Sequence, residues 1–370
     1  MKNNLLLGVT GSIAASKTEK LHKLLSNDYN IKIVSTLEGL KYLSDGFKNN
    51  NRIIYSWDLE EGSPHIELSR WANKIVIYPA TANFISKLNY GISDDILLAT
   101  TLMYTDSIYI APAMHEEMYL NEKTQNNILE LSNKHIFCGP KYGKLDIGDE
   151  GLGRMLEPVE LINILNKTKD KVIVTSGPTF EKIDLVRGIT NSSSGKQGRA
   201  IAYELLSKGY DVIYIHSDLI KPVPHAKNIM YSTSDELYQN ILSNITDVKS
   251  IYMTSAVSDF IPEQFDKKLD RENGELVLKL SPNIDIIKTI KSQYKDIKVI
   301  GFSAQIDNKL NFNKINAKNC DYLVINNLNE NYFGSDNNKI YIIDKKKLIY
   351  ESTLENKNII AQHIIKNTVT

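Results

Sequence analysis

Cysteine is scarce in this 370-residue chain, and neither sign of charge is in excess. The two cysteines, Cys138 and Cys320, lie far apart and in no CxxC spacing, which argues against a disulfide framework or a zinc knuckle and predicts a reducing compartment. Lysine plus arginine and aspartate plus glutamate both number 44, so no net field would draw the chain to nucleic acid or to an anionic membrane surface. We therefore expect no polyanionic partner.

Long apolar runs are also missing. No stretch reaches the roughly 18 apolar residues that indicate a membrane-spanning helix, and the apolar run in "MKNNLLLGVTGS" is too short for the hydrophobic core of a signal peptide. The sequence therefore predicts a cytoplasmic enzyme. Because 42% of the residues are hydrophobic, the chain can bury a substantial core, and a length of about 150 residues per domain favours two domains.

A strand followed by a glycine loop and a helix occurs twice in the chain. The first copy is "NLLLGVTGSIAAS", and the second starts at Lys171 with "KVIVTSGPTF", where a longer loop precedes the helix. Between them, "EPVELINILNKTKDK" is an amphipathic helix followed by a polar stretch at 166–170, which is typical of a domain boundary. We therefore predict two domains, at 1–168 and 169–370.

Strands and helices alternate in both predicted domains, which is typical of parallel, doubly wound sheets. The sequence predicts an α/β fold with two Rossmann-like, three-layer domains and mostly parallel sheets. Strands are expected near 4–10, 31–35, 74–79, 107–111, 171–176, 211–216, 250–255, 298–303, 321–325, 339–343 and 347–351. Helices of the first domain are expected near 12–25, 81–88, 94–103 and 115–131.

Small and polar residues follow several predicted strands of the first domain. Gly11 and Ser12 lie where a strand leads into a helix, where backbone N–H groups can receive an anion, although such glycines also serve simply to turn the chain. Thr81, Ala82 and Asn83 follow the strand "IVIYPA", at the end where open sheets place ligands. "YIAPAMHEEMY" repeats this design, which indicates a slot for a planar cofactor. The chain lacks GxGxxG, which argues against an NAD dehydrogenase.

The segment "ITNSSSGKQG" at 189–198 combines hydroxyl side chains, glycine and lysine ahead of a predicted helix. A Walker A loop needs GxxxxGK[ST], but Gln197 follows Lys196 and no glycine stands at the required earlier position. The segment is therefore either an anion site of another kind or a serine-rich cap on a helix that begins near Gly195.

Motifs in the two halves resemble two enzyme families. "GSIAAS", "HIELSRWANKIVIYPATAN", "APAMHEEMY" and "GLGRMLEP" are similar to flavin-dependent cysteine decarboxylases, and specifically to phosphopantothenoylcysteine decarboxylase. "TSGPTFEKIDLVRGITNSSSGKQG", "TSAVSDF", "VIGFSAQ" and "YLVINNL" with "FGSDNN" resemble phosphopantothenate–cysteine ligase, in that family's order. Together the motifs cover nearly the whole chain. The chain thus resembles the bifunctional coenzyme A biosynthesis proteins, with archaeal-type variants at several positions.

For the first half, the resemblance implies an FMN-dependent decarboxylation of phosphopantothenoylcysteine. A carboxylate β to a thiol does not leave readily, but oxidation of the thiol by the flavin supplies an electron sink, and the reduced flavin returns the electrons afterwards. His65 is implied as the active-site histidine and His115 as a second catalytic residue. The implied flavin contacts are Gly11, Ser12, Ile13, Thr36, Ala82, Asn83 and Met114.

For the second half, the resemblance implies condensation of 4′-phosphopantothenate with cysteine. A carboxylate is a poor acyl donor, so CTP first converts it to an acyl-cytidylate with pyrophosphate as leaving group, aided by Mg²⁺. The implied substrate contacts are Arg187, Asn191, Ser193, Ser194, Gly195 and Lys196, with Asn191 catalytic. The implied nucleotide contacts are Met253, Thr254, Ser255, Asp259, Ile284, Asp285, Ile286, Ile287, Phe302, Lys314 and Lys318, with Asp259 near the ribose or the metal.

A lysine on a mobile loop over the ligase site is also implied. Here "FDKKLDREN" supplies Lys268 as the catalytic and nucleotide-binding candidate, with Lys267 as the alternate. Such a lysine can close over pyrophosphate and exclude water that would hydrolyse the anhydride. The same segment also fits a plain charged turn.

Two positions depart from the decarboxylase pattern. The family motif often reads PAMN, whereas this chain has His115, which can still donate a hydrogen bond to a carboxylate. The bacterial flap reads LACG, whose cysteine protonates the reduced intermediate, whereas Ile147 cannot give a proton. The remaining proton sources are Cys138, Tyr142, Asp146, His115 and water. These changes leave two alternatives open, a ligase whose flavin domain no longer decarboxylates and a flavin-binding regulatory subunit.

The resemblance finally implies a homo-oligomer. Flavin domains of this type form trimers and ligase domains form dimers, and the two symmetries combine in a closed dodecamer. The expected partners are the small-molecule substrates 4′-phosphopantothenate, cysteine and CTP, with no nucleic acid and no membrane. The sequence does not distinguish CTP from ATP.

Overall fold

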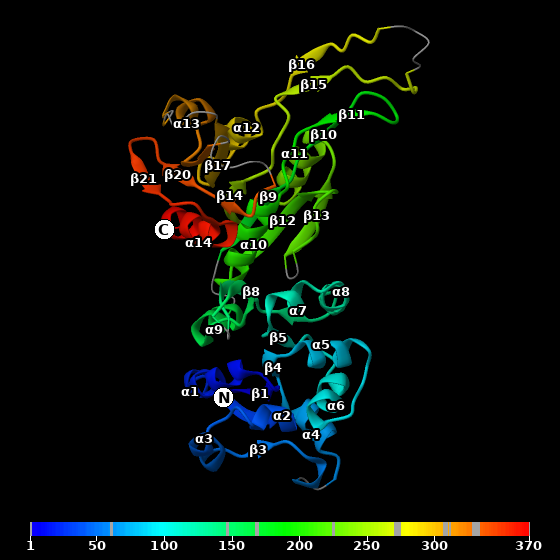
Figure 1. The fold of residues 1–370 in the computed structure, drawn as a ribbon, viewed down its shortest axis with the longest axis vertical. Helices are drawn as coiled ribbons and strands as arrows, with labels where there is room; N and C mark the ends of the chain where they lie inside the picture. The colour runs from blue at the N-terminus through cyan, green and yellow to red at the C-terminus, as the bar shows by residue number, and fades with distance from the viewer. Residues whose placement is uncertain are drawn as a thin grey trace. The chain divides into compact units, whose positions relative to one another are not determined.

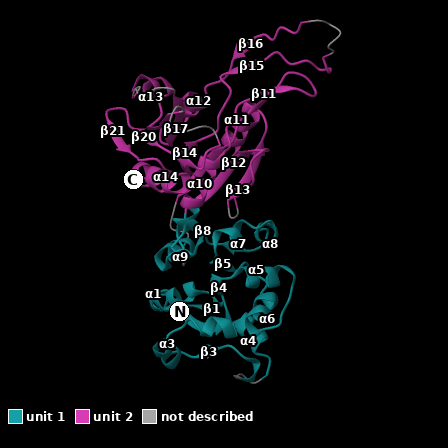
Figure 2. Cartoon of the chain, in the orientation of Figure 1, with its two compact units in different colours: residues 1–168, 206–209 teal, residues 169–205, 210–370 magenta. Residues whose placement is uncertain are grey.

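The computed structural model describes residues 2–59, 62–145, 148–166, 170–223, 226–269, 275–305, 310, 312–327 and 334–369. The chain forms two compact units, which Figure 2 colours separately. Unit 1 contains residues 1–168 and 206–209, and unit 2 contains residues 169–205 and 210–370.

Unit 1 is built on a six-stranded parallel sheet with the order β3-β2-β1-β4-β5-β6. Along β4, Ile75 and Ile77 contact one helix layer, whereas Val76 and Tyr78 contact the other, as expected for a strand buried on both faces. The strands are β1 (Asn3–Val9), β2 (Tyr29–Ser35), β3 (Ile53–Ile54), β4 (Lys74–Ala80), β5 (Tyr109–Pro112) and β6 (Ile136–Phe137).

Helices cover both faces of this sheet. Helices α1 (Thr18–Leu25) and α9 (Pro158–Leu165) pack on one face through leucines. The other face is covered by α4 (Pro64–Trp71), α5 (Ala82–Asn89), α6 (Ile96–Met103) and α8 (Glu122–Leu131). Unit 1 also contains the 3-10 helices η1 (Ile13–Lys17) and η2 (Trp57–Leu59), the short helices α2 (Leu37–Leu40), α3 (Asp45–Asn50) and α7 (Glu116–Leu120), and the hairpin of β7 (Lys141–Lys144) and β8 (Glu150–Arg154).

Unit 2 is built on an eight-stranded sheet with the order β13-β12-β9-β14-β17-β18-β20-β21. Neighbouring strands from β13 to β18 are parallel, and β20 and β21 add an antiparallel edge. The strands are β9 (Lys171–Ser176), β12 (Asp211–Ser217), β13 (Lys227–Tyr231), β14 (Val248–Met253), β17 (Lys298–Gln305), β18 (Tyr322–Asn327), β20 (Ile340–Ile343) and β21 (Leu348–Glu351).

Helices also cover the second sheet. Helices α11 (Ser234–Ser243), α12 (Ile286–Gln293) and α13 (Phe312–Lys318) join the core around Ile173 and Ile251. Two longer helices, α10 (Lys196–Ser207) and α14 (Lys357–Thr368), bury further apolar residues such as Ile201 and Ile360. Strand β19 (Asn337–Asn338) pairs with β22 (Glu355–Asn356). Two hairpins extend from the body of the unit in Figure 1, one of β10 (Phe180–Lys182) and β11 (Gly188–Thr190), the other of β15 (Phe260–Pro262) and β16 (Leu280–Pro282).

The predicted α/β fold with two mostly parallel sheets is confirmed, and each predicted strand has a counterpart. Two predicted helices differ in detail. The helix expected at 12–25 begins as the 3-10 helix η1, and the helix expected at 115–131 is interrupted at Asn121, whose side chain caps α8. Among the described residues, no helix has both the length and the apolar character needed to cross a bilayer.

Candidate functional site

The strand order of each sheet reverses between two central strands, β1 and β4 in unit 1 and β9 and β14 in unit 2. In open parallel sheets the chains leaving two such strands lead to opposite faces, which leaves a crevice at their carboxyl ends where ligands bind. A cavity lies at this position in each unit.

The cavity of unit 1, cavity A, has a volume of about 700 Å³. Its walls come from the loops after β1, β2, β4 and β5, and the hydroxyl groups of Thr36 and Thr81 there cap α2 and α5. The side chains of Ile96, Leu98 and Met118 add apolar surface. Of the predicted flavin contacts, cavity A contains Gly11, Ser12, Thr36, Ala82, Asn83 and Met114.

A second cavity of about 700 Å³, cavity B, shares Ser12, Ala113 and Met114 with cavity A. Ile13 and His115 line it. The seven predicted flavin contacts and His115 therefore surround two adjoining cavities. Small polar residues, apolar walls and this combined volume fit a flavin with a substrate beside it.

His65 lies on α4, directly behind a residue that lines cavity A. Its ring packs edge-on against Trp57, with 5.3 Å between the ring centroids, and Trp57 lines cavity A. The Nδ1 atom of His65 is buried and has no hydrogen-bond partner among the described residues. Because a buried polar atom without a partner is costly, this nitrogen is available to a ligand.

His115 is held between two carboxylates. Its Nδ1 hydrogen-bonds to Glu117 Oε2, and its Nε2 lies 3.7 Å from Asp149 Oδ2. The hydrogen bond from its own backbone N–H and the bond to His115 lower the pKa of Glu117. The loop is also pinned by close packing, since a Cβ on Gly153 of β8 would lie 2.1 Å from the Met114 carbonyl oxygen. This arrangement can hold and move a proton beside cavity B.

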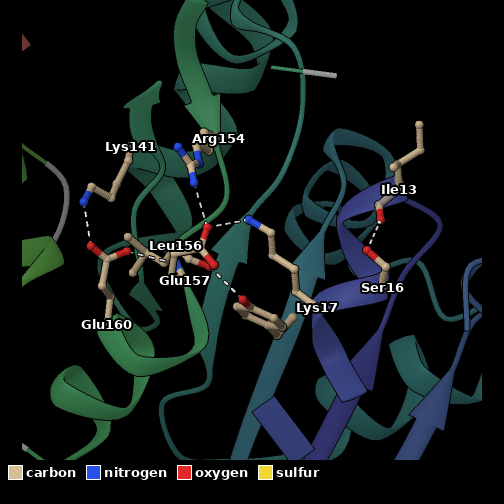
Figure 3. Close-up of polar contacts among 9 residues, drawn as sticks. Ile13, Ser16, Lys17, Lys141, Arg154, Leu156, Glu157 and Glu160 are labelled. Atoms are coloured by element: carbon tan, nitrogen blue, oxygen red, sulfur yellow. Dashed lines mark hydrogen bonds and ion pairs between the residues drawn. The ribbon is translucent and has the colours of Figure 1, made fainter. Parts of the chain in front are cut away.

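A charged network borders cavity B, and Figure 3 shows it in close-up. Glu157 accepts hydrogen bonds from Lys17 (2.7 Å) and Arg154 (2.8 Å), both of which line the cavity. Although burial raises the pKa of Glu157, these two bonds lower it overall. The network therefore keeps two cations at the cavity edge, where they can offset the charge of an anionic substrate.

The structure distinguishes among the predicted proton sources. Cys138 is fully buried in the core of unit 1, burial raises its pKa, and it lines neither cavity. Burial also raises the pKa of Tyr142, which likewise lines neither cavity. Asp146 and Ile147 lie outside the described residues. Of the three candidate side chains that the structure describes, His115 lines cavity B.

The cavity of unit 2, cavity C, has a volume of about 200 Å³. Gly195 adopts a φ of +66°, and a Cβ on Gly198 would lie 2.2 Å from Thr254 Oγ1, so α10 begins against the loop that follows β14. Of the predicted residues, cavity C contains Ser193, Ser194, Gly195, Lys196, Thr254, Ser255 and Phe302.

Asn191 does not line cavity C but fixes its wall. Its Nδ2 donates to the carbonyl of Ala256 (2.5 Å), and its Oδ1 accepts from the N–H of Ser193 (3.2 Å). Ala256 and Ser193 both line the cavity. The hydroxyl of buried Tyr231 lies 2.8 Å from Ser255 Oγ and orients that side chain in the same wall.

Arg187 and Lys268 lie together elsewhere in unit 2. The carboxylate of Asp184, a residue only 3% exposed, accepts from the N–H groups of Val186 (2.8 Å), Arg187 (2.7 Å) and Leu269 (3.0 Å). The bond from Leu269 chiefly lowers the pKa of Asp184. The Arg187 guanidinium also donates to the Leu269 carbonyl. Asp184 thus joins the turn that carries Arg187 to the segment that carries exposed Lys268.

Several predicted nucleotide contacts lie outside cavity C. Met253, Ile286 and Ile287 are buried in the core of unit 2, where they pack against other apolar side chains. Ile284 is 41% exposed. The packing of the three core residues accounts for their apolar character without a ligand.

The predicted charged contacts form local pairs. Asp285 caps α12 and lies 3.9 Å from Lys318, while Lys314 donates to Ser303 Oγ (3.4 Å). Asp259 is exposed. Within the described ranges, no group of three or more histidine, cysteine, aspartate or glutamate side chains is placed to hold a metal ion.

Four further residues line cavities and were not predicted from the sequence, namely Trp57, Lys17, Arg154 and Lys357. For Lys357 a signal exists, because it is the first residue of α14, whose first turn has no acidic residue. A helix N-terminus normally favours negative charge.

Both halves of the chain match family models. Residues 1–169 match the model described as Flavoprotein, and residues 167–370 match the model described as DNA/pantothenate metabolism flavoprotein C-terminal domain. The first matched segment contains the residues that line cavities A and B, and the second contains the residues that line cavity C.

Similar proteins span the same length. The Coenzyme A biosynthesis bifunctional protein CoaBC of Bacillus subtilis is 34% identical over 367 residues, which cover 92% of this chain and 90% of that protein. The protein of the same name from Methanocaldococcus jannaschii is 33% identical, covering 98% and 92%. A solved structure of a PPC decarboxylase mutant complexed with pantothenoylaminoethenethiol is 29% identical, covers 45% of this chain and 97% of its own, and has a TM-score of 0.42. The chain therefore belongs to the family of the coenzyme A biosynthesis bifunctional proteins CoaBC.

Proposed function

We propose that this chain carries out two consecutive steps of coenzyme A biosynthesis. Residues 169–370 condense 4′-phosphopantothenate with cysteine through an acyl-cytidylate made from CTP. Residues 1–168 bind FMN and decarboxylate phosphopantothenoylcysteine to 4′-phosphopantetheine. The observation that carries this proposal is the similarity to bifunctional relatives across both halves, over 92% and 98% of the chain.

In the first half, we assign the flavin to cavity A and the substrate to cavity B. The flavin, when bound, supplies the electron sink that lets a carboxylate leave. Lys17 and Arg154 offset the negative charge of the phosphorylated substrate. His115, paired with Glu117, donates the proton that the product gains on carbon, and the side chain of His65 completes the wall next to Trp57.

In the second half, Asn191 fixes the wall against which the activated acyl group lies, and Lys196 offsets phosphate charge. Lys268 closes over the pyrophosphate and excludes water. Mg²⁺, when bound, would be held mainly by the phosphates of the nucleotide, with exposed Asp259 as the candidate protein ligand, since this ion commonly uses one or two carboxylates plus substrate phosphates. We also propose that the chain forms a homo-oligomer, a closed dodecamer.

The test uses one preparation of the full chain for both half-reactions. With 4′-phosphopantothenate, cysteine, CTP and Mg²⁺, we expect equal amounts of pyrophosphate and CMP, followed by CO₂ at the same stoichiometry. With phosphopantothenoylcysteine alone, we expect CO₂ without CMP. Replacing CTP by ATP measures the nucleotide preference, and light scattering on the same sample measures the oligomeric state.

The alternatives give different products. Pyrophosphate without CO₂ from a flavin-loaded sample would indicate a ligase whose flavin half does not decarboxylate. Neither product would indicate a binding subunit and would contradict the proposal. The full-length similarity to bifunctional relatives does not favour either alternative.

A further inference from the structure

Two lysines at the start of two helices meet at cavity C. Lys196 is the first residue of α10 and Lys357 is the first residue of α14, and both line the cavity. Neither helix has an acidic residue in its first turn. Because a helix N-terminus carries partial positive charge, each lysine adds like charge where an anion is preferred. Such an arrangement costs stability unless an anion is present.

Groups of the chain itself satisfy these lysines in the structure. The ammonium of Lys196 lies 2.6 Å from Asp336 Oδ1 and donates to the Gly334 carbonyl (2.8 Å). The ammonium of Lys357 donates to the Ser335 carbonyl (2.5 Å), and its backbone N–H donates to the Asp336 carbonyl (2.9 Å). The segment at 334–336 therefore serves as an internal counter-ion for both helix starts.

The cavity itself offers these cations no carboxylate. Among the described residues that line it, two are lysines and none is acidic. Burial and the charge of Lys196 lower the pKa of Lys357, and the charge of Asp336 opposes this effect. The exposed fraction of the Asp336 side chain is 76%, so solvent screens much of its attraction.

A second observation also indicates a ligand. Asn338 lines cavity C and is only 6% exposed, yet its Oδ1 has no hydrogen-bond partner among the described residues. The buried Oε1 of Gln197, on the same wall, is also unpartnered there, while the Gln197 amide nitrogen donates to the Lys357 carbonyl (3.1 Å). The Asn338 amide can turn to present its N–H donors to ligand oxygens, whereas the bond to the Lys357 carbonyl fixes the orientation of the Gln197 amide.

We propose that Lys357, together with Lys196 and Asn338, forms a subsite for a phosphate group of a ligase substrate, and that the Asp336 carboxylate competes with this phosphate for Lys196. The inference rests on the proposed ligase function. Cavity C, at about 200 Å³, is smaller than the roughly 300 Å³ at which small-molecule pockets begin, so it takes part of a substrate. The phosphate comes either from the nucleotide or from 4′-phosphopantothenate.

Calorimetric titration of the full-length, flavin-loaded protein tests the subsite with pyrophosphate, CTP and 4′-phosphopantothenate as separate probes. Lys357→Gln is expected to weaken binding about tenfold for the probe whose phosphate occupies the subsite, because a charge-assisted hydrogen bond is lost. Lys357→Arg is expected to retain most of the affinity. Lys366→Gln, on the exposed last turn of the same helix, is the matched control and is expected to leave affinity unchanged.

Asp336→Asn is expected to change phosphate affinity in the opposite direction to Lys357→Gln. An ion pair with only a structural role would not produce an increase in affinity when it is broken. Releasing Lys196 is expected to tighten phosphate binding about two- to fivefold, the range of an exposed ion pair. If Lys357→Gln loses affinity for pyrophosphate and CTP, the subsite holds a phosphate of the nucleotide. If it loses affinity for 4′-phosphopantothenate, the subsite holds the phosphate of that acid.

The subsite is overturned if Lys357→Gln binds all three probes as the wild type does, or if Asp336→Asn weakens binding. A wild-type protein that binds the probes in a Lys357-dependent way but releases no pyrophosphate on turnover would contradict the ligase function instead.

Discussion

The chain that leaves the first central strand takes a short path in unit 1 and a long one in unit 2. After β1, the 3-10 helix η1 begins at Ile13, four residues beyond Val9. After β9, the chain forms the hairpin β10–β11 before α10 begins at Lys196. The strand order around the reversal is the same in both. One topology therefore gives two kinds of site, which differ in the length of the loop that follows the first central strand.

The consequence is visible in the cavities. The short loop leaves two adjoining spaces of about 700 Å³ each, which suit a flat cofactor and its substrate. The cavity that follows the long loop has about 200 Å³ and is lined by small hydroxyl residues and lysine. If the sites are independent, a substitution at one reversal point should leave the reaction at the other unchanged.

The two largest effects are expected from one residue in each unit, and the first concerns the wall of cavity C. Asn191→Asp keeps the size of the side chain but removes its donor to the Ala256 carbonyl. We expect pyrophosphate release to fall about 100-fold, because a misplacement of about 1 Å in an active-site wall can cost that much, while CO₂ release from phosphopantothenoylcysteine stays unchanged. Asn240→Asp, on α11, removes a similar bond to the Met230 carbonyl of β13 and is the control. Equal losses in the two variants would contradict the proposed role.

A similar loss in the other reaction is expected from His115. His115→Gln keeps a polar side chain but removes the group paired with Glu117, so CO₂ release should fall about 10²- to 10⁴-fold while bound flavin and pyrophosphate release persist. His22→Gln, on α1 and away from both cavities, is the matched control. A flavin-loaded His115→Gln protein with normal CO₂ release would assign the proton to another donor.

Two glycines, one beside the site of each unit, allow the two sites to be compared through the free energy of unfolding. A Cβ on Gly153 would lie 2.1 Å from the Met114 carbonyl, and one on Gly198 would lie 2.2 Å from Thr254 Oγ1. Substitution by alanine should therefore destabilise the affected unit by about 1–3 kcal/mol, measured by chemical denaturation. Gly153→Ala should also weaken the retention of flavin, and Gly198→Ala should slow the turnover of the ligase. Gly46→Ala, whose nearest neighbour would be at 3.9 Å, should have neither effect.

The smallest effect is expected from the pH dependence of Asp184. Its pKa is lower in the folded protein than in the unfolded chain, so its contribution to stability is present above the unfolded pKa and is lost as pH falls through the folded one. Asp184→Asn should therefore flatten the acid limb of the stability curve and speed hydrogen exchange at the Leu269 amide. An unchanged exchange rate at Leu269 would show that Asp184 does not hold the segment carrying Lys268.

Most of the fold could be predicted from the sequence because buried parallel strands are continuous apolar runs. The stretches at 74–79 and 171–176 contain such runs, and they form the central strands β4 and β9. The interruption at Asn121 was not predicted, because residues 121–127 are all polar and show no apolar period that could mark a break. The capping bond to the Lys123 N–H reveals it. Short elements such as β3 and the hairpins have too few residues to show a period.

The site could be predicted in part. Residues that follow strand ends, such as Gly11 and Asn83, line a cavity because parallel strands bring their carboxyl ends to one edge. Lys357 could not be found this way, because it follows a short antiparallel pairing rather than a parallel strand. The role of Asp184 was equally hidden, since its partner Leu269 is distant in sequence and contributes only a backbone N–H.

Both cysteines of the chain are fully buried, and burial raises their pKa, for Cys320 to about 11. Since the thiolate is the reactive species, the folded protein should resist maleimides at neutral pH. An enzyme that handles free cysteine thereby keeps its own sulfur out of mixed disulfides. For the experimenter, the native protein is already a low-background host for fluorescent labelling. A dye attached through Asp266→Cys, at an exposed position in the same segment, would leave Lys268 in place and test whether that segment closes during turnover.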